Sequence, residues 1–354
     1  MRRGVKRRPR RGPTIVDVAR RAGVSTAAVS FALNGRPGVG EETRARILAV
    51  AREVGWEPSA SARSLRGRRA FAMGLVIARD PAVLSADPFF PAFIAGVEME
   101  LATLGQALLL QVVSDDAERE ADRYRQLARS ERVDGVFLTD LRSADTRIEL
   151  LAELGLPAVT LNRPDVPSPF PAVCLDDGPG VAAAVHHLAE LGHTRIAHVS
   201  GRADLLQGAR RRAFWTEAMA ALGLATDLVA VADFTAAAGA RATRDLLRTP
   251  DRPTAIIYAN EVMAIAGLTV AHELGFAPPN DLSLVGYEDS ELAAHVYPSL
   301  TSVRSDPVGW GRAATRVLRD AIEGRPADVE LEPARLVVRD STAAPRSEQQ
   351  RRST

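Results

Sequence analysis

Apolar positions recur at helical spacing in three short segments near the start of the chain. Helices are predicted at about residues 14–22, 25–33 and 41–54, where Thr14 and Asp17 give the start of a capping box and Gly23 supplies the first turn. Three short helices with a glycine turn between the first two are typical of a helix-turn-helix, whose second helix enters the DNA major groove. The spacing by itself fits another small helical bundle equally well.

From residue 70 to 342 the pattern changes to short apolar runs that alternate with helical segments. Strands are predicted at residues 73–78, 107–113, 133–138, 158–161, 196–199, 228–231, 255–258 and 282–285. Strands that alternate with helices predict parallel, doubly wound sheets, and such sheets bind ligands at the carboxyl ends of their strands. Because the alternation restarts with a helix at residue 180, we expect two similar lobes.

Composition limits the compartment and the partners. The 354 residues carry a formal net charge of +1, so bulk charge does not indicate a nucleic-acid partner. Residues 1–13 form a basic tail that is predicted to be disordered, and it is either solvated or an arm that contacts phosphates. We find no signal peptide and no apolar run of the ~20 residues that a membrane span needs, so we expect a soluble, cytoplasmic protein without a membrane partner.

Motifs of enzymes and metal sites are absent from the sequence. No phosphate-binding, dinucleotide-binding, zinc-protease or serine-hydrolase motif occurs, and the single cysteine, Cys174, excludes an internal disulfide and a site of several thiolates. His186, His187 and His193 are close in sequence, but adjacent histidines on a helix point in different directions, which favours surface or capping roles over metal binding. We therefore predict that the protein is no enzyme and uses no metal and no cofactor.

Residues 14–34 carry a motif more specific than helical spacing, TIVDVARRAGVSTAAVSFALN. With its helix cap, turn glycine and second helix in register, this segment resembles the head of the LacI/GalR family of bacterial transcription factors. The resemblance implies that Thr26 and Ala27 contact base edges and that Ser30 and Phe31 lie one helical turn further along. It also implies phosphate contacts from Thr14, Ser25, Asn34 and Thr43.

Two residues depart from the family pattern of this DNA-binding domain, which is expected at residues 14–58. Phe31 replaces the usual arginine, so a bidentate contact to guanine is excluded, and its ring either contacts a thymine methyl group or packs inward. Gly40 replaces the usual serine cap, which weakens the third helix start and removes a phosphate contact. Residues 59–69 match the hinge helix and linker that follow the head in the family, and Leu65 matches the leucine that wedges into the minor groove.

The remainder of the chain, residues 70–342, resembles the effector-binding domain of the same family. The most specific blocks are residues 187–197, 259–264, 284–289 and 298–301. The resemblance implies an α/β fold in which the all-α head joins a two-lobed, periplasmic-binding-protein-like sensor with parallel doubly wound sheets. The expected ranges are about 70–161 plus 302–328 for the first lobe, about 172–296 plus 330–342 for the second, and 343–354 for a polar tail. The positions implied to face the effector are Arg211, Phe234, Asn260 and Glu288. Further candidates are Phe89 and Phe90, on the loop after the first strand, and Asn162, directly after the strand at residues 158–161.

The resemblance implies a sequence-specific repressor that binds a pseudo-palindromic double-stranded operator as a homodimer and responds to a small effector. A sugar is the expected effector, and a nucleobase or another small polar metabolite is the alternative. Glu261, Glu288, Phe214 and a long loop at residues 79–88 depart from the family pattern and are expected to change the volume of the cleft. The competing functions are a transport receptor, which would need an export signal and lack the head, and an architectural protein, which would bind DNA without sequence preference.

Overall fold

The computed structural model describes residues 13–33, 37–56 and 69–346. The chain divides into two compact units, residues 1–70 and 71–354, which we call the head and the sensor. The head has one hydrophobic core of its own, and the sensor has separate cores on the faces of its sheets. None of the helices in the described ranges is long and apolar enough to cross a membrane.

Within its described residues the head contains three helices, α1 (Ile15–Ala22), α2 (Thr26–Leu33) and α3 (Glu41–Glu53), as predicted. The predicted capping box is present at the start of α1, because the Thr14 hydroxyl accepts from the Asp17 N–H while the Asp17 carboxylate accepts from the Thr14 N–H. Gly23 ends α1 with a φ of 68°, a left-handed conformation that glycine adopts without steric cost.

One fully buried side chain from each helix forms the centre of the head, namely Val18, Val29 and Ile47. At the start of α3, Gly40 makes no side-chain cap, in agreement with the expected weak helix start. The head is therefore held by a small apolar core and by the caps of its first two helices. Ser25 supplies the second of these caps, since its hydroxyl accepts from the Ala28 N–H at 3.1 Å.

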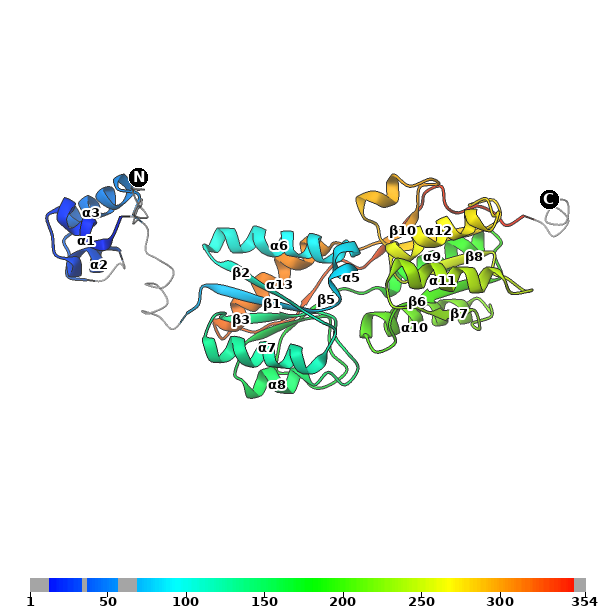
Figure 1. Cartoon of the computed structure of the whole chain (residues 1–354), viewed down its shortest axis with the longest axis horizontal. Helices are drawn as coiled ribbons and strands as arrows, with labels where there is room; N and C mark the ends of the chain where they lie inside the picture. The colour runs from blue at the N-terminus through cyan, green and yellow to red at the C-terminus, as the bar shows by residue number, and fades with distance from the viewer. Residues whose placement is uncertain (1–12, 34–36, 57–68, 347–354) are drawn as a thin grey trace, which may run out of the picture. The chain divides into compact units, whose positions relative to one another are not determined.

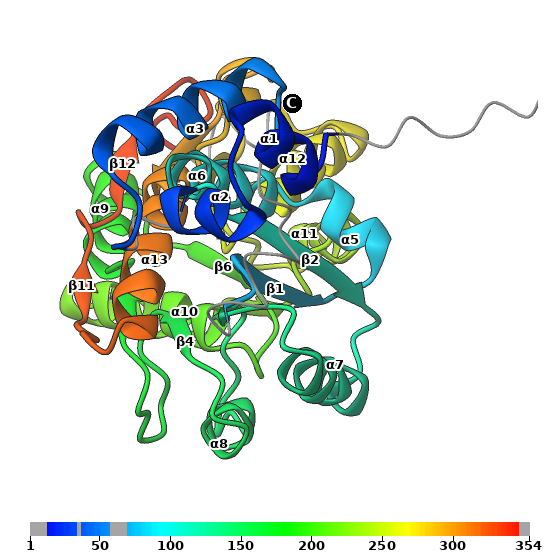
Figure 2. The same ribbon diagram turned by 90° about the vertical axis from the view of Figure 1, so that its left-hand side faces the viewer.

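The first lobe of the sensor is a six-stranded sheet between two pairs of helices. The strand order is β11-β5-β4-β3-β1-β2, and every pair is parallel. The strands are β1 (Ala72–Ala78), β2 (Ala107–Val113), β3 (Gly135–Leu138), β4 (Ala158–Leu161), β5 (Ala172–Cys174) and β11 (Val329–Glu330). One face of the sheet packs on α6 (Phe89–Leu104) and α13 (Pro307–Ile322), and the other on α7 (Ala117–Ser130) and α8 (Arg147–Glu153) (Figures 1 and 2).

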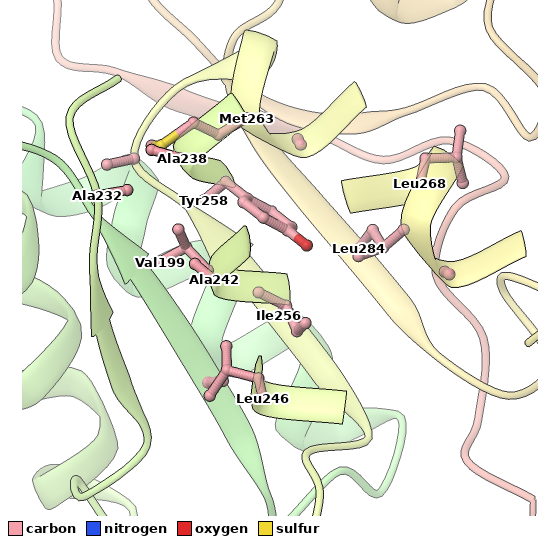
Figure 3. Packing of buried hydrophobic residues seen from close by; sticks show 14 of the residues in the cluster. Val199, Ala232, Ala238, Ala242, Leu246, Ile256, Tyr258, Met263, Leu268 and Leu284 are labelled. Carbon is pink, nitrogen blue, oxygen red and sulfur yellow. The ribbon is translucent and has the colours of Figure 1, made fainter. Parts of the chain in front are cut away.

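The second lobe repeats this plan with the order β12-β10-β9-β8-β6-β7, in which β12 alone pairs antiparallel. Its strands are β6 (Ile196–Ser200), β7 (Val229–Val231), β8 (Ala255–Tyr258), β9 (Ser283–Glu288), β10 (Thr301–Arg304) and β12 (Arg335–Val337). Figure 3 shows side chains of β6, β8 and β9 pointing toward those of α11 (Ala236–Leu247) and α12 (Glu261–Glu273). The opposite face packs on α9 (Gly178–Glu190) and α10 (Leu206–Ala221). Two parallel sheets confirm the predicted fold class.

The chain crosses between the lobes three times, after β5, β10 and β11. Three of the approximate lobe boundaries expected from the sequence lie one to three residues before these crossings. Strand β5 (residues 172–174) completes the first sheet instead of opening the second lobe, β10 (301–304) pairs with β9 in the second sheet, and β11 (329–330) returns to the first. Because these strands are only two to four residues long, their pairing partners and not their local pattern decide the sheet to which they belong.

Two glycines allow α6 and α13 to approach at backbone distance. A Cβ atom on Gly96 would lie 2.0 Å from the Val308 carbonyl oxygen, and one on Gly311 would lie 2.2 Å from that of Phe93. The close contact brings the first turns of both helices together at the carboxyl edge of the first sheet. Their aromatic residues Phe89 and Trp310 meet there edge to face, with ring centroids 5.8 Å apart.

Candidate functional site

A cavity lies between the two lobes at the carboxyl ends of the strands, where the fold predicts a ligand site. Side chains of the first lobe that line it are Arg79, Asp87, Phe89, Thr139, Asp140, Leu161, Asn162 and Trp310. The second lobe and the crossing after β10 contribute Gln207, Arg211, Phe234, Asn260, Glu288 and Ser305. Six of the seven positions expected to face the effector therefore line one cavity, and the seventh, Phe90, does not.

Phe90 belongs to the core of the first lobe. Its ring is 1 % exposed and packs among the apolar side chains between the sheet and α6. Adjacent residues of a helix point about 100° apart, so only one of Phe89 and Phe90 can face the cavity while the other enters the core. The expectation that Phe90 contacts the effector is therefore corrected.

The first-lobe wall is organised by an arginine just after β1. The Arg79 guanidinium donates to both oxygens of Asp140, from Nε and Nη2 at 2.7 Å each, and its Nη1 donates to Asp87 Oδ2 at 2.7 Å. Asp87 Oδ1 accepts in turn from the Phe89 N–H at 2.9 Å. Burial would lower the pKa of Arg79, but the Asp140 and Asp87 carboxylates raise it above its ordinary value. The wall is thus a paired ionic network before any ligand arrives.

A second buried arginine fixes the loop that carries Asp140. Arg147 is 5 % exposed, and its Nη2 donates to the carbonyl oxygens of Thr139 and Asp140 at 3.1 and 2.8 Å. Its Nε and Nη2 also donate to Asp145 and its Nη1 donates to Glu120, with distances of 2.6–2.8 Å. The clamp on these two carbonyls fixes the backbone from which the Asp140 side chain reaches the cavity.

Arg211, on α10, organises the second-lobe wall. Its Nε donates to Asp177 Oδ2 at 3.0 Å, its Nη1 donates to the Ala259 carbonyl oxygen at 2.7 Å, and its guanidinium lies 3.5 Å from the centre of the Tyr287 ring. Burial would lower the pKa of Arg211, but Tyr287 and Asp177 raise it above its ordinary value. The side chain is a fixed cation, and Nη2 takes no part in these hydrogen bonds.

Asn260 and Asn162 line the cavity, and their side-chain amides also form hydrogen bonds that hold the surrounding backbone. Asn260 caps α12, since its Oδ1 accepts from the Met263 N–H at 3.1 Å, and its Nδ2 donates to the Phe234 carbonyl oxygen at 2.9 Å. Asn162 Oδ1 accepts from the Leu175 N–H at 2.7 Å. Each amide therefore holds a segment of the cavity wall, and the Asn260 amide positions the ring of Phe234.

Glu288 ends β9 in a left-handed conformation with a φ of 108°, and Asp289 follows with 57°. This turn is held because Asp289 pairs with Arg304 and, at 2.6 Å, with Arg339. The Glu288 Oε2 atom is buried and has no hydrogen-bond partner among the described residues. Burial raises the pKa of Glu288 well above its ordinary value, and the Asp87 carboxylate raises it further.

Hydrogen bonds connect the two walls along one rim of the cavity. Gln207 Nε2, in the second lobe, donates to Asp140 Oδ1 in the first at 2.9 Å. The Leu206 N–H donates to the Leu141 carbonyl oxygen at 2.8 Å. The same loop that presents Asp140 to the cavity therefore also contacts the start of α10.

Sequence reasoning missed Arg79, Asp87, Thr139, Asp140, Leu161, Gln207, Ser305 and Trp310. Position directly after a predicted strand would have indicated Arg79, Thr139 and Asp140, because that rule had already indicated Asn162. No local signal marks Asp87 or Gln207. Glu261 and Phe214, which were expected to change the cleft, do not line it: Glu261 accepts from the Ser290 N–H at 3.0 Å, and Phe214 packs in the core beside α9.

The predicted DNA-contacting residues of α2 lie on its accessible face. Thr26 and Ala27 are exposed, Ser30 is half-buried, and Phe31 is 38 % exposed, with its ring beside Gly38. Thr43 is half-buried. Thr14 and Ser25 are the helix caps described above, and Asn34 and Leu65 lie outside the described residues.

The three neighbouring histidines have separate partners. His186 Nδ1 contacts the Ala182 carbonyl oxygen at 2.8 Å, His187 Nε2 contacts the Thr342 hydroxyl at 2.9 Å, and buried His193 lies between the hydroxyl groups of Thr254 and Ser283. Within the described ranges, no group of three or more histidine, cysteine or acidic side chains could hold a metal ion.

Comparison with known proteins gives matches over both units. Residues 14–59 match the model of bacterial regulatory proteins of the lacI family, and residues 185–342 match that of a periplasmic binding protein-like domain. The transcriptional regulator CelR of Thermobifida fusca is 36 % identical over 334 residues, which cover 93 % of this chain and 96 % of CelR. The transcriptional repressor PurR of Klebsiella pneumoniae is 32 % identical over 337 residues, 93 % of this chain and 97 % of PurR.

Solved structures of such regulators are also similar to this chain. The complex of CelR with cellobiose is 34 % identical with a TM-score of 0.72, over 93 % of this chain and 99 % of that one. The lac repressor dimer bound to operator and the anti-inducer ONPF is 25 % identical with a TM-score of 0.82, over 94 % and 100 %. These relatives are transcriptional regulators and not enzymes. The chain therefore belongs to the LacI family and is a DNA-binding transcriptional regulator with a periplasmic-binding-protein-like sensor.

Proposed function

We propose that this regulator is a repressor whose affinity for its operator is set by a sugar bound between the lobes of the sensor. The observation that carries the proposal is the cavity itself, in which charged groups and aromatic rings converge from both lobes. Carboxylates and guanidinium groups accept from and donate to hydroxyl groups, and aromatic faces pack on the apolar faces of sugar rings. The relatives add support, because CelR is solved with cellobiose and PurR is named a repressor.

On the DNA, we infer that a homodimer reads a pseudo-palindrome, one head to each half-site. The solved lac repressor dimer on its operator supports this arrangement. Thr26 and Ala27 are proposed to read base edges, together with Ser30 and Phe31, while Thr14, Ser25, Asn34 and Thr43 are proposed to hold phosphates. Residues 59–69 are proposed as the hinge, with Leu65 in the minor groove.

Two arms of one experiment test the proposal. The full chain is used to select sequences from random DNA duplexes, and its affinity for the selected site is then measured by fluorescence anisotropy with and without cellobiose and a panel of other sugars. We expect a two-fold symmetric consensus and a change of operator affinity of about 5–150-fold on adding the effector. Uniform binding of all duplexes would contradict the operator, and no response to any sugar would contradict the effector class.

A substitution in α2 tests base reading directly. The Thr26→Ala variant is expected to select a different consensus, because a mismatch at a contacted base pair costs ~1–3 kcal/mol. The Thr14→Ala variant is the matched control and should weaken binding to all sequences alike. An unchanged consensus for Thr26→Ala would remove this residue from the proposed interface.

A further inference from the structure

Two carboxyl groups from opposite lobes enter the cavity in different surroundings. Asp87 has a donor on each oxygen, Arg79 Nη1 at 2.7 Å and the Phe89 N–H at 2.9 Å. Glu288 has a buried Oε2 without a partner among the described residues. The Glu261 backbone N–H donates to the Glu288 carboxyl group and favours its ionised form, but an ionised Oε2 would lose its hydration without gaining a donor, whereas a neutral carboxylic acid can itself donate a hydrogen bond.

The charges around Glu288 also favour its neutral form. The titratable groups that act on Glu288 from the surrounding elements are Asp87, Arg211, Glu261, Arg79 and Tyr287. Both cations of this set are already paired with other carboxylates, Arg79 with Asp87 and Asp140, and Arg211 with Asp177. Two acids of the set therefore add repulsion, while the cations compensate only in part. Burial raises the pKa of Glu288 well above its ordinary value, the Asp87 charge raises it further, and Arg211 opposes the rise.

We propose that Glu288 is a neutral hydrogen-bond donor in the ligand-free cavity, and that it selects an uncharged effector that accepts this hydrogen bond. The part that concerns the effector rests on the proposed function, whereas the part that concerns the proton does not. A hydroxyl, ring or glycosidic oxygen of a sugar is a suitable acceptor. An effector with an ammonium group would instead take the place of the proton and require Glu288 to be ionised.

If Glu288 carries a proton in the folded state, the stability of the ligand-free protein should decrease as the pH rises. The native state binds the proton more tightly than the unfolded chain, because the pKa of Glu288 is raised on folding. The stability that this proton contributes is therefore full at low pH and is lost as the pH rises through the raised pKa. A glutamine at this position keeps a donor and cannot ionise, so it removes the dependence.

The first test uses the full chain without ligand. Melting temperatures of the wild type and of Glu288→Gln are compared at about pH 5.5 and about pH 8.5, and the variant is expected to gain at least ~2–4 °C on the wild type over this range. Glu217→Gln, an exposed position on α10, is the control and should gain nothing. Infrared spectra should show the band of a protonated carboxyl group near neutral pH, absent from Glu288→Gln and retained in the control.

A second variant keeps the test valid if Glu288→Gln does not fold. Asp87→Asn removes the opposing charge, so the infrared band is expected to disappear at lower pH than in the wild type. A band that is absent from the wild type, or that does not move in Asp87→Asn, would overturn the assignment of the proton.

The effector arm uses cellobiose as the probe in calorimetric titrations. Wild-type affinity is expected to fall about tenfold per pH unit above the pKa of Glu288, while that of Glu288→Gln stays constant. An affinity that rises with pH would overturn the neutral donor. If cellobiose does not bind at any pH, this result counts against the proposed effector, and the ligand-free measurements decide the charge of Glu288 independently.

Discussion

The two walls of the cavity differ in how far their charges are satisfied before a ligand binds. In the first lobe, Arg79 is bonded to two carboxylates through all three guanidinium nitrogens. In the second lobe, Arg211 uses Nε and Nη1 for the fold, and Glu288 Oε2 has no partner among the described residues. The first wall is thus built as a rigid frame, and the second presents unsatisfied polar atoms to the proposed effector. Substitutions in the first wall should therefore affect folding, and those in the second should affect ligand response.

The largest expected effect is the loss of the ionic frame in the first lobe. Arg79→Ala should reduce the free energy of unfolding by about 3–5 kcal/mol, because it leaves the Asp87 and Asp140 carboxylates buried and unpaired. Chemical denaturation of the sensor measures the change. The control is Arg163→Ala, which removes an exposed arginine that also pairs with two carboxylates and should cost less than ~1 kcal/mol. Equal losses of unfolding free energy in the two variants would show that the buried ion pairs of Arg79 do not stabilise the first lobe more than exposed ones.

The second prediction concerns the ligand-facing wall. Arg211→Ala is expected to weaken effector binding by at least about 100-fold, or ~2.7 kcal/mol, and to abolish the effector response, while operator affinity without effector changes by less than about twofold. Operator titrations with and without effector give both quantities. Arg212→Ala changes the exposed neighbour and should leave the response intact. If the sugar that shifts the melting temperature of the wild type shifts Arg211→Ala equally, Arg211 does not contact the ligand.

The same contrast explains which site residues could be predicted. Arg211, Phe234, Asn260 and Glu288 come from the second lobe, where their positions could be matched to the family one by one, although Glu288 itself replaces the usual aspartate. Arg79 and Asp87 flank the segment at residues 79–88 that departs from that pattern and contains a short helix, α5 (Pro81–Ala86). Pairing of Arg79 with Asp140, 61 residues away, depends on the sheet order and not on any local spacing.

The fold was predictable for most strands and helices that are long enough to show their period, although the 16-residue helix α13 is an exception. The eight expected strands are all present, because each is a continuous apolar run between turns. The sequence reading did not identify β5, β10, β11, β12 and α13. The strands among these are two to four residues long and lie near the crossings, and α13 reaches back from the second lobe to pack on α6. Their places are set by tertiary contacts that no window of sequence contains.

A third prediction extends the comparison to the interiors of the lobes. The first lobe buries the paired charges of Arg147 and Glu120, whereas the second buries His198 as a neutral ring stacked on Trp215. Burial lowers the pKa of His198 to about 4, so the unfolded chain takes up a proton between about pH 6.5 and pH 4 that the native state does not. Stability should therefore fall on acidification through this range, by about 2 kcal/mol at pH 5.

Denaturation of His198→Phe at several pH values checks this sign. The variant keeps a ring beside Trp215 and should lose this part of the acid dependence. His186→Asn, at an exposed position, is the control and should retain it. If His198→Phe loses stability as steeply as the wild type between about pH 6.5 and pH 5, another group is responsible.

The smallest expected effect tests the hydrogen bond that joins the two walls. Gln207 Nε2 donates to Asp140 Oδ1 at 2.9 Å, and Asp140 is already held by Arg79 and by the clamp of Arg147 on its carbonyl. Gln207→Leu keeps the volume and removes the donor, so each lobe should remain as stable while the contact between the two walls is weakened. Effector affinity should fall about three- to tenfold, the equivalent of one hydrogen bond of ~0.5–1.5 kcal/mol. A loss as large as that of Arg211→Ala would mean that Gln207 contacts the ligand itself. Gln207 would then belong to the ligand-facing wall and not to the contact between the walls.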